Sequence, residues 1–266
     1  MPGGDRGGVG AYRIFMRKFI AFFILLFLGV PVLKLQADDT TQEMNNANQG
    51  TEAAVTAVTD FFVQRYSDAN GIHLESVISA LGATAGFGTQ IAIREAFIKT
   101  GKISEKAAFV VITTKDGNRY YFGDLLNEGL LGDVPKKQIS VWGLIAGGAQ
   151  AAGATSLPDI QEIARHNAAV LGSAEFGVPR LPEGHVLKEL PLEVLRQTWP
   201  SVRSILEKNQ PDPRFWGWIP ALAIQKILIH RKDSIDPFLA ATIAMEAAIP
   251  MSKLDPETVI SPASIP

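Results

Sequence analysis

The chain has 266 residues, of which 47% are hydrophobic and 20% are charged, and it contains no cysteine. These proportions are typical of a folded globular protein rather than a disordered chain. The lack of cysteine excludes disulfides, thiol nucleophiles and metal sites built on cysteine. Residues 1–37 hold five basic residues and one acidic residue, which leaves 20 basic and 26 acidic residues in the rest. This mildly acidic body has no basic run, so nucleic acid is not an expected partner.

A short apolar segment near the N-terminus has the features of a secretory signal peptide. Arg17 and Lys18 precede an uncharged run of 15 residues, 19–33, rich in Phe, Ile and Leu. A membrane-spanning helix needs about 20 apolar residues, whereas this length suits a signal peptide. We therefore expect cleavage near Ala37, with Met16 as the true start, and export to the periplasm or beyond. The alternatives are an anchor formed by residues 19–33, the one expected contact with a membrane, and a buried core helix.

The remaining chain is expected to form one domain. Residues 38–50 are polar and predict a flexible lead-in, residues 51–255 a single mostly helical globular domain, and residues 256–266 a loose tail. No repeat of fixed period suggests a second unit. We expect about seven to nine helices in orthogonal or bundle-like packing, with one small antiparallel β-hairpin at about 108–123.

In chain order, apolar spacing and capping residues predict two helices, the hairpin and then six more helices. A helix in the later group contains Pro200 and is expected to break or restart there. Residues 172–191 and 210–220 are rich in Pro and predict loops. The expected helices cover about 51–67, 74–100, 124–131, 138–154, 156–171, 192–209, 219–232 and 236–248.

The hairpin prediction comes from the sequence FVVITTKDGNRYYF, residues 109–122. β-Branched and aromatic runs flank Asp116-Gly117, the dipeptide that favours a two-residue type I′ turn. Both faces of such a hairpin are largely apolar, so we expect it to be packed under helices. The turn places Lys115 opposite Asn118, Thr113 opposite Tyr120, Ile112 opposite Tyr121 and Val111 opposite Phe122.

Two uncharged segments contain glycines four residues apart, Gly82 with Gly86 and Gly143 with Gly147. Glycine inside a helix costs about 0.5–1 kcal/mol relative to alanine, so a packing gain is the expected compensation. We expect these small residues to let buried helices approach closely, against each other or against a third helix. The alternative is that they are pairing faces of membrane-inserted helices.

The strongest pair for acid–base chemistry is Glu162 and His166, which are four residues apart on an expected helix. A carboxylate can orient an imidazole, and such a pair can act as a base or as metal ligands. The same pair is also a common surface contact of helices, and no third ligand follows at a metal spacing. No phosphate-binding loop, dinucleotide fingerprint or metal motif occurs in the chain. We expect neither a metal nor a cofactor.

The Pro-rich loops provide candidate binding residues. Arg180 and His185 lie in the first loop, and Arg214 and Trp216 lie in the sequence PRFWGW of the second. Loops of this kind often carry binding groups, and an aromatic plane beside a guanidinium can stack on a ligand or a partner. The alternative, which we favour, is that these residues hold the loops against the core.

Stretches such as LGATAGFGTQ, YYFGDLL, SVWGLIAGGAQ, FGVPRLP and AIQKILI resemble parts of uncharacterised bacterial proteins, over roughly residues 55–255. This resemblance implies no activity and no catalytic residue. The leading hypothesis is an exported or envelope-associated helical protein that binds a protein or a small molecule. The alternatives are a hydrolase-like enzyme that uses Glu162 with His166 or the 174–191 loop, and a membrane-inserting protein.

Overall fold

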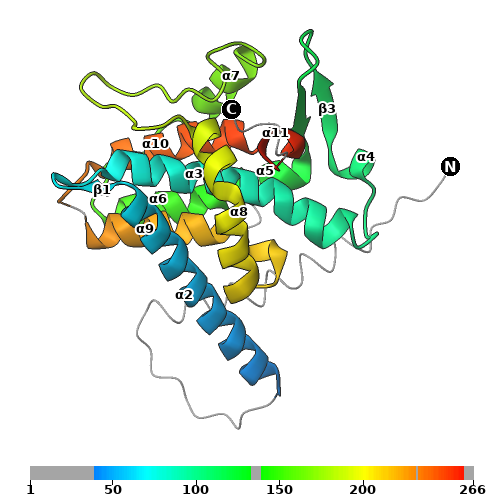
Figure 1. Ribbon diagram of the computed structural model, residues 1–266, viewed down its shortest axis with the longest axis horizontal. Helices are drawn as coiled ribbons and strands as arrows, with labels where there is room; N and C mark the ends of the chain where they lie inside the picture. The colour runs from blue at the N-terminus through cyan, green and yellow to red at the C-terminus, as the bar shows by residue number, and fades with distance from the viewer. Residues whose placement is uncertain (1–38, 133–138, 232, 261–266) are drawn as a thin grey trace.

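The computed structural model describes residues 39–132, 139–231 and 233–260 (Figure 1), so the expected leader and residues 261–266 of the expected tail lie outside the described residues. The described chain is mainly helical with two small antiparallel sheets, which confirms the predicted fold class. In chain order its elements are α2 (Asp39–Arg65), β1 (Ser67–Asp68), β2 (Gly71–Ile72), α3 (Leu74–Ile93), the π-helical turn η1 (Arg94–Ile98), α4 (Glu105–Ala108), β3 (Val110–Thr113), β4 (Arg119–Phe122), α5 (Asp124–Leu131), α6 (Val141–Ala151), α7 (Ile160–Ala169), α8 (Pro191–Asn209), the 3-10 turn η3 (Pro213–Phe215), α9 (Trp218–His230), α10 (Pro237–Met251) and α11 (Pro256–Ile260).

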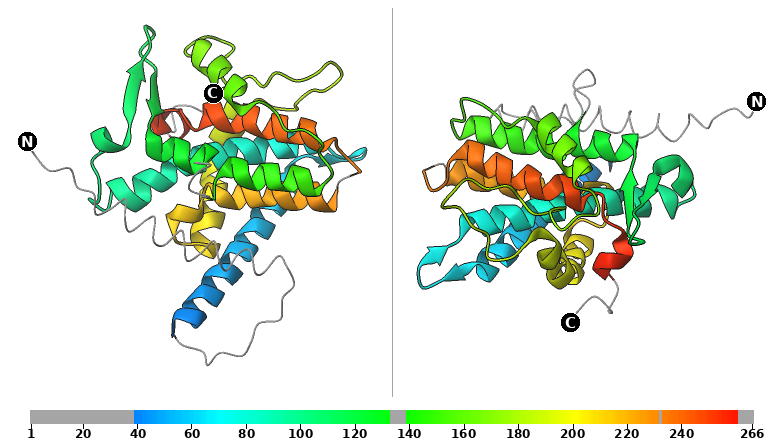
Figure 2. Two further views of the ribbon diagram at one scale, coloured as in Figure 1. Left: turned by 180° about the vertical axis from the view of Figure 1, so that it is seen from behind. Right: turned by 90° about the horizontal axis from the view of Figure 1, so that it is seen from above.

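Helix α3 forms the centre of the protein and is buried over nearly its whole length. It packs against α10, α9 and α8, and α6 covers α9 and α10 from the other side (Figure 2). Phe87 of α3 meets Trp199 of α8 edge to face, with ring centroids 4.8 Å apart. A helix that is apolar all round must be surrounded in this way, because no face of it is suited to water.

Helix α3 approaches α10 through the first pair of glycines. A Cβ atom added at Gly82 would lie 2.4 Å from the carbonyl oxygen of Ala244, and one added at Gly86 would lie 2.0 Å from that of Ala248. Both distances are far below ordinary van der Waals contact, so only glycine permits this backbone approach. The expectation that small residues bring α3 close to another helix is confirmed.

The second pair of glycines does not itself make the expected close contact of α6 with another helix. Gly143 is exposed, and a Cβ at half-buried Gly147 would meet nothing nearer than the Gln225 amide at 3.5 Å. The close contact with α9 is made by the next residue, Gly148, where a Cβ would lie 2.8 Å from the Cα of Gln225. A four-residue spacing alone does not indicate which face of the helix is buried.

One helical segment among the described residues, Leu74–Ile98, is long and apolar enough to cross a membrane. Its most apolar stretch is entirely buried inside the protein. The central helix of a folded core has the same length and composition, and the packing of α3 on α10, α9 and α8 agrees with that interpretation.

The predicted hairpin is present, but its register is shifted by one residue. Val110 pairs with Phe122, Ile112 with Tyr120 and Thr113 with Arg119. The turn holds three residues rather than two: Thr114 N–H donates to Asn118 O, and Gly117 N–H donates to Thr114 O with Gly117 at φ +85°. This arrangement is typical of a type I turn followed by a glycine bulge.

The expectation that helices cover the whole hairpin is wrong for one of its strands. Tyr120 and Tyr121 of β4 are buried, whereas all four residues of β3 are exposed and Val110 is 65% accessible. The outer edge of β4 is occupied by the chain after α10, where Tyr121 N–H donates to Lys253 O at 2.8 Å. β4 therefore lies between β3 and that segment, and the tip of the hairpin extends beyond the helices (Figure 1).

Three further differences concern helix limits. Helix α2 begins at Asp39 and includes nearly all of the segment 38–50 expected as a flexible lead-in, Gly50 among it. Helix α8 continues through Pro200, because residues on both sides of it are buried against one core. The expected loose tail contains the short helix α11.

Candidate functional site

The sequence candidates Glu162 and Arg180 are brought together, and they bind each other. Arg180, in the loop after α7, donates from Nη1 and Nη2 to the two carboxylate oxygens of Glu162 at 2.8 and 2.9 Å. Its Nε and Nη2 also donate to Oε1 of Glu246 on α10, at 2.9 and 2.6 Å. One guanidinium thus joins the loop to α7 and α10.

Glu246 is the buried member of this group, with 3% of its surface exposed. Burial raises the pKa of its carboxyl, although Arg180 opposes the shift. The hydrogen bonds from Arg180 lower the pKa of Glu162. His166 is near enough to favour the charged form of both carboxylates. The cluster has the contacts of a structural ion pair that fixes the loop on the core.

His185 lies apart from that cluster, at the start of α3. Its Nδ1 is 3.3 Å from Oε1 of Glu75, whose other oxygen is 3.8 Å from Nδ1 of His73. His73 caps α3 by accepting the N–H of Ser76. The loop that precedes α8, residues 172–190, is attached to α3 here as well, because Lys188 N–H donates to the Ser76 hydroxyl. His185 and the Glu162–Arg180 pair therefore do not share a cleft.

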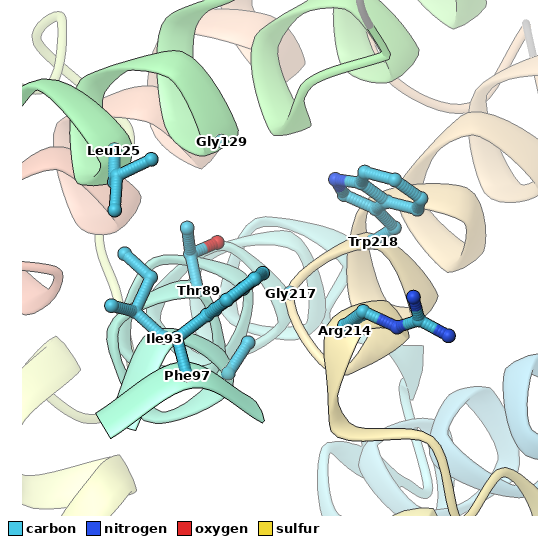
Figure 3. Close-up of a pocket in the computed structure, with 9 residues that line it drawn as sticks. Thr89, Ile93, Phe97, Leu125, Gly129, Arg214, Gly217 and Trp218 are labelled. Atoms are coloured by element: carbon cyan, nitrogen blue, oxygen red, sulfur yellow. The ribbon is translucent and has the colours of Figure 1, made fainter. Parts of the chain in front are cut away.

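The two candidates of the second loop also make internal contacts. Trp216 is buried and donates from Nε1 to Gln210 O at 3.0 Å. Arg214 pairs with Asp212 and borders a cavity of about 30 Å³, the volume of about one water molecule. In Figure 3 the guanidinium of Arg214 points away from Thr89 and Ile93 on the other wall. This cavity is too small for an organic ligand.

Two larger cavities are lined by charged groups that are exposed or already paired. A cavity of about 300 Å³ between α2 and α9 has Lys226 at its edge, which pairs with Glu52. A cavity of about 330 Å³ beside β4 and α8 contains Arg119, which pairs with Asp255 and Glu257. Neither leaves a buried charge without a counter-charge among the described residues that line it.

A fourth cavity, of about 230 Å³, is different because it has a buried lysine in its wall. We call it the Lys253 cavity. Lys253 has 6% of its surface exposed, and Asn167 on the opposite helix is equally buried. Its lining comes from β4, α5, α7, the loop after α7, α10 and the chain that follows α10: Phe122, Asn127, Leu130, Leu131, Gln161, Ala164, Asn167, Ala168, Phe176, Ile249 and Lys253. Gln161 and Ala168 of α7 are exposed, so this side of the cavity borders solvent.

The backbone around Lys253 is fixed from two sides. Gln90, fully buried on α3, donates from Nε2 to Ser252 O at 3.0 Å and to Leu254 O at 2.9 Å. On the other side Tyr121 N–H donates to Lys253 O. These bonds explain a polar side chain in the last turn of the buried helix α3, since buried carbonyls need donors. These bonds also fix the backbone from which the Lys253 side chain extends.

The ammonium of Lys253 has few partners. Nζ donates to Asn127 Oδ1 at 3.2 Å and lies 5.2 Å from the centre of the Phe122 ring. Among the described residues no carboxylate forms an ion pair with it. Burial lowers the pKa of Lys253 to about 8, because the charged form loses its hydration. A buried, poorly compensated charge beside a cavity is a frequent mark of a functional site.

Sequence reasoning did not select Lys253. It lies in SKLDP, at the expected end of the domain near residue 255. Its burial depends on Gln90 and on β4, which are distant in sequence. Among the residues that the structure describes, no group of three histidines or acidic residues could hold a metal ion. Comparisons with known protein families, curated proteins and solved structures found nothing that matches the chain.

Proposed function

We propose that the protein binds a small molecule in the Lys253 cavity. The observation that carries this proposal is a buried ammonium, held in place by a fixed backbone, in the wall of a cavity of about 230 Å³. An apolar cavity of about 150 Å³ already accommodates benzene, so this one has room for a ring with a polar substituent. Apolar walls with a few convergent polar groups are the usual composition of ligand sites.

The enzyme alternative has weaker support. Glu162 and Arg180 satisfy each other, and neither lines the four cavities described above, nor do His166 and His185. The residues that line the Lys253 cavity include no carboxylate or histidine to serve as a base. Binding therefore agrees better with these side chains than catalysis does.

Ligand binding is tested by titrating the ¹⁵N-labelled protein with benzoate, benzamide and benzyl alcohol while amide signals are followed by NMR. We expect at least one probe to shift signals of residues that line the cavity. Ala164→Phe, which fills the cavity, should abolish the shift. Ala174→Phe is the matched control, since Ala174 is exposed and lines the neighbouring cavity instead. If none of the three probes shifts these signals, the proposal is wrong.

We also propose that the chain is exported and cleaved near Ala37. Support comes from Arg17 and Lys18 before the uncharged run 19–33. The test is the intact mass of protein recovered from the periplasm or medium of a bacterial host. A mature chain that begins close to Asp38 is the expected result, and retention of residues 19–33 would exclude cleavage.

A further inference from the structure

The chemistry of the Lys253 cavity restricts the class of ligand, if the proposed function holds. The lining residues from β4, α5, α7, α10 and the loop after α7 contain no other titratable side chain among those described. Asp255, two residues along the chain, pairs with Arg119, and Glu246, two turns earlier on α10, pairs with Arg180. The carboxylates closest in sequence are thus already engaged.

A buried ammonium without a carboxylate is costly, and a ligand that brings a negative charge removes that cost. Three amides, of Asn127, Gln161 and Asn167, line the same cavity. Asn127 accepts a hydrogen bond from the lysine, and Asn167 donates from Nδ2 to Ile163 O at 2.9 Å. Gln161, at the exposed mouth, retains an N–H that can donate to a second ligand oxygen.

The apolar residues of the lining determine which kind of group the ligand can carry besides its charge. Leu130, Ile249 and Ala164 face it, together with the rings of Phe122 and Phe176. These surfaces gain from contact with apolar groups and offer them no hydrogen bonds. Phe176 is itself held by Tyr120, with ring centroids 4.8 Å apart, so this wall is anchored to the hairpin. An apolar body of about the size of one ring matches the available volume.

We infer that the ligand is a small monocarboxylate with an apolar body, whose carboxylate pairs with Lys253 Nζ. This inference rests on the proposed function and narrows it. The ligand enters along the exposed side of α7 near Gln161, its carboxylate lies at the lysine and its apolar part contacts Phe122 and Phe176. Aromatic and short aliphatic acids share this chemistry.

The test uses three probes with the same ring and different charge: benzoate, benzamide and benzylamine. Affinities are measured by NMR titration or calorimetry at pH 7. We expect benzoate to bind wild-type protein at least about tenfold more tightly than benzamide, the lower range for a hydrogen bond to a charged group. Lys253→Met should reduce this preference to less than about twofold. Lys99→Met, at an exposed position, should retain it.

A second measurement uses the wild-type protein alone. Because the pKa of Lys253 is about 8, the free protein loses the ammonium between pH 7 and 9.5. The affinity for benzoate should therefore fall about tenfold or more over that range, whereas the affinity for benzamide should not change. A constant benzoate affinity would overturn the carboxylate assignment even if Lys253→Met folded poorly.

The outcomes separate the inference from the function on which it rests. Benzamide or benzylamine binding as tightly as benzoate overturns the carboxylate assignment and leaves the cavity as a ligand site. Failure of all the probes to bind overturns both. A borohydride-trapped adduct of benzaldehyde on Lys253, formed by a protein that does not bind benzoate, would show that the amine captures carbonyl compounds instead.

Discussion

Replacing Gly86 by alanine tests the close packing of α3 on α10. The added Cβ would lie 2.0 Å from Ala248 O and 2.7 Å from its carbonyl carbon, whereas ordinary contact begins at 3.4 Å. The obstructing atoms belong to the backbone, so no rotamer change relieves the clash. The two helices would have to separate by more than about 1 Å along an interface that is buried on both sides, and the close packing of protein interiors resists such a shift.

The magnitude follows from two opposing effects. Overpacking of a tight core costs about 1–3 kcal/mol, and a clash between two backbones belongs at the upper end of that range. Alanine returns about 0.5–1 kcal/mol through its better helix propensity. We therefore expect Gly86→Ala to lower the free energy of unfolding by about 2 kcal/mol, which corresponds to a fall in Tm of about 4–8 °C for a chain of this size.

The matched control is Gly147→Ala on α6, where the nearest atom to an added Cβ is at 3.5 Å and the site is half-buried. This change should leave stability unaltered or raise it by up to about 1 kcal/mol. Urea unfolding followed by tryptophan fluorescence measures both variants. The reasoning fails if Gly86→Ala is as stable as wild type, or if Gly147→Ala is destabilised to the same extent.

Three further changes test the buried polar groups. Lys253→Met removes a buried charge, so it should stabilise the free protein at pH 7. Because the folded pKa of Lys253 is lowered to about 8 from 10.5, the unfolded chain binds more protons between these values. The free energy of unfolding of the wild type should therefore rise by about 2–3 kcal/mol relative to that of the variant as the pH rises from 7 to 10. Thermal unfolding at both pH values measures this, and a gap that does not change with pH contradicts the reasoning. Arg180→Met leaves Glu246 buried without its cation and should cost about 2–3 kcal/mol, less than a fully buried pair since the Arg180 side chain is 37% exposed. Adding Glu246→Gln should restore most of the loss, and because burial raises the pKa of Glu246 the loss should be smaller at pH 5 than at pH 8; a double variant no better than Arg180→Met contradicts this. Gln90→Leu leaves two buried carbonyls without a donor and should cost about 2–4 kcal/mol in urea unfolding, whereas Gln64→Leu on the exposed face of α2 should be neutral.

The helices with strong local signals could be predicted from the sequence. Helix α5 begins at Asp124 and ends at Leu131 as expected, and α7, capped by Asp159, lies within the range 156–171 expected for it. These limits depend on capping residues and on apolar spacing, which act within a few residues. The existence of the hairpin follows from the same kind of local evidence.

Features set by distant contacts could not be predicted in this way. The hairpin register depends on whether two or three residues form the turn, and Asp116-Gly117 is compatible with both. Gly148, not Gly147, meets α9 because the rotation of α6 is fixed by the helices around it. Continuity of α8 through Pro200 likewise depends on burial of both its halves.

The contrast between local signals and distant contacts also explains why the sequence did not reveal the candidate site. Glu162, His166, Arg180 and His185 have side chains that attract attention in a sequence, and the structure gives Glu162, Arg180 and His185 partners that fasten the 172–190 loop. Lys253 carries no motif. Its place in the proposed site follows from its burial, from the Phe122 ring near its ammonium and from the two bonds of Gln90, none of which a local pattern reveals.

Titration of the lysines by NMR tests the central claim most directly. In protein labelled with ¹³Cε-lysine, the signal absent from Lys253→Met is assigned to this residue and followed from pH 6 to 11. We predict a pKa of about 8 for Lys253 in the free protein, well below the ordinary value of a lysine side chain, and an upward shift of this pKa when benzoate is bound. A signal that titrates with the exposed lysines, and does not respond to benzoate, would contradict the account.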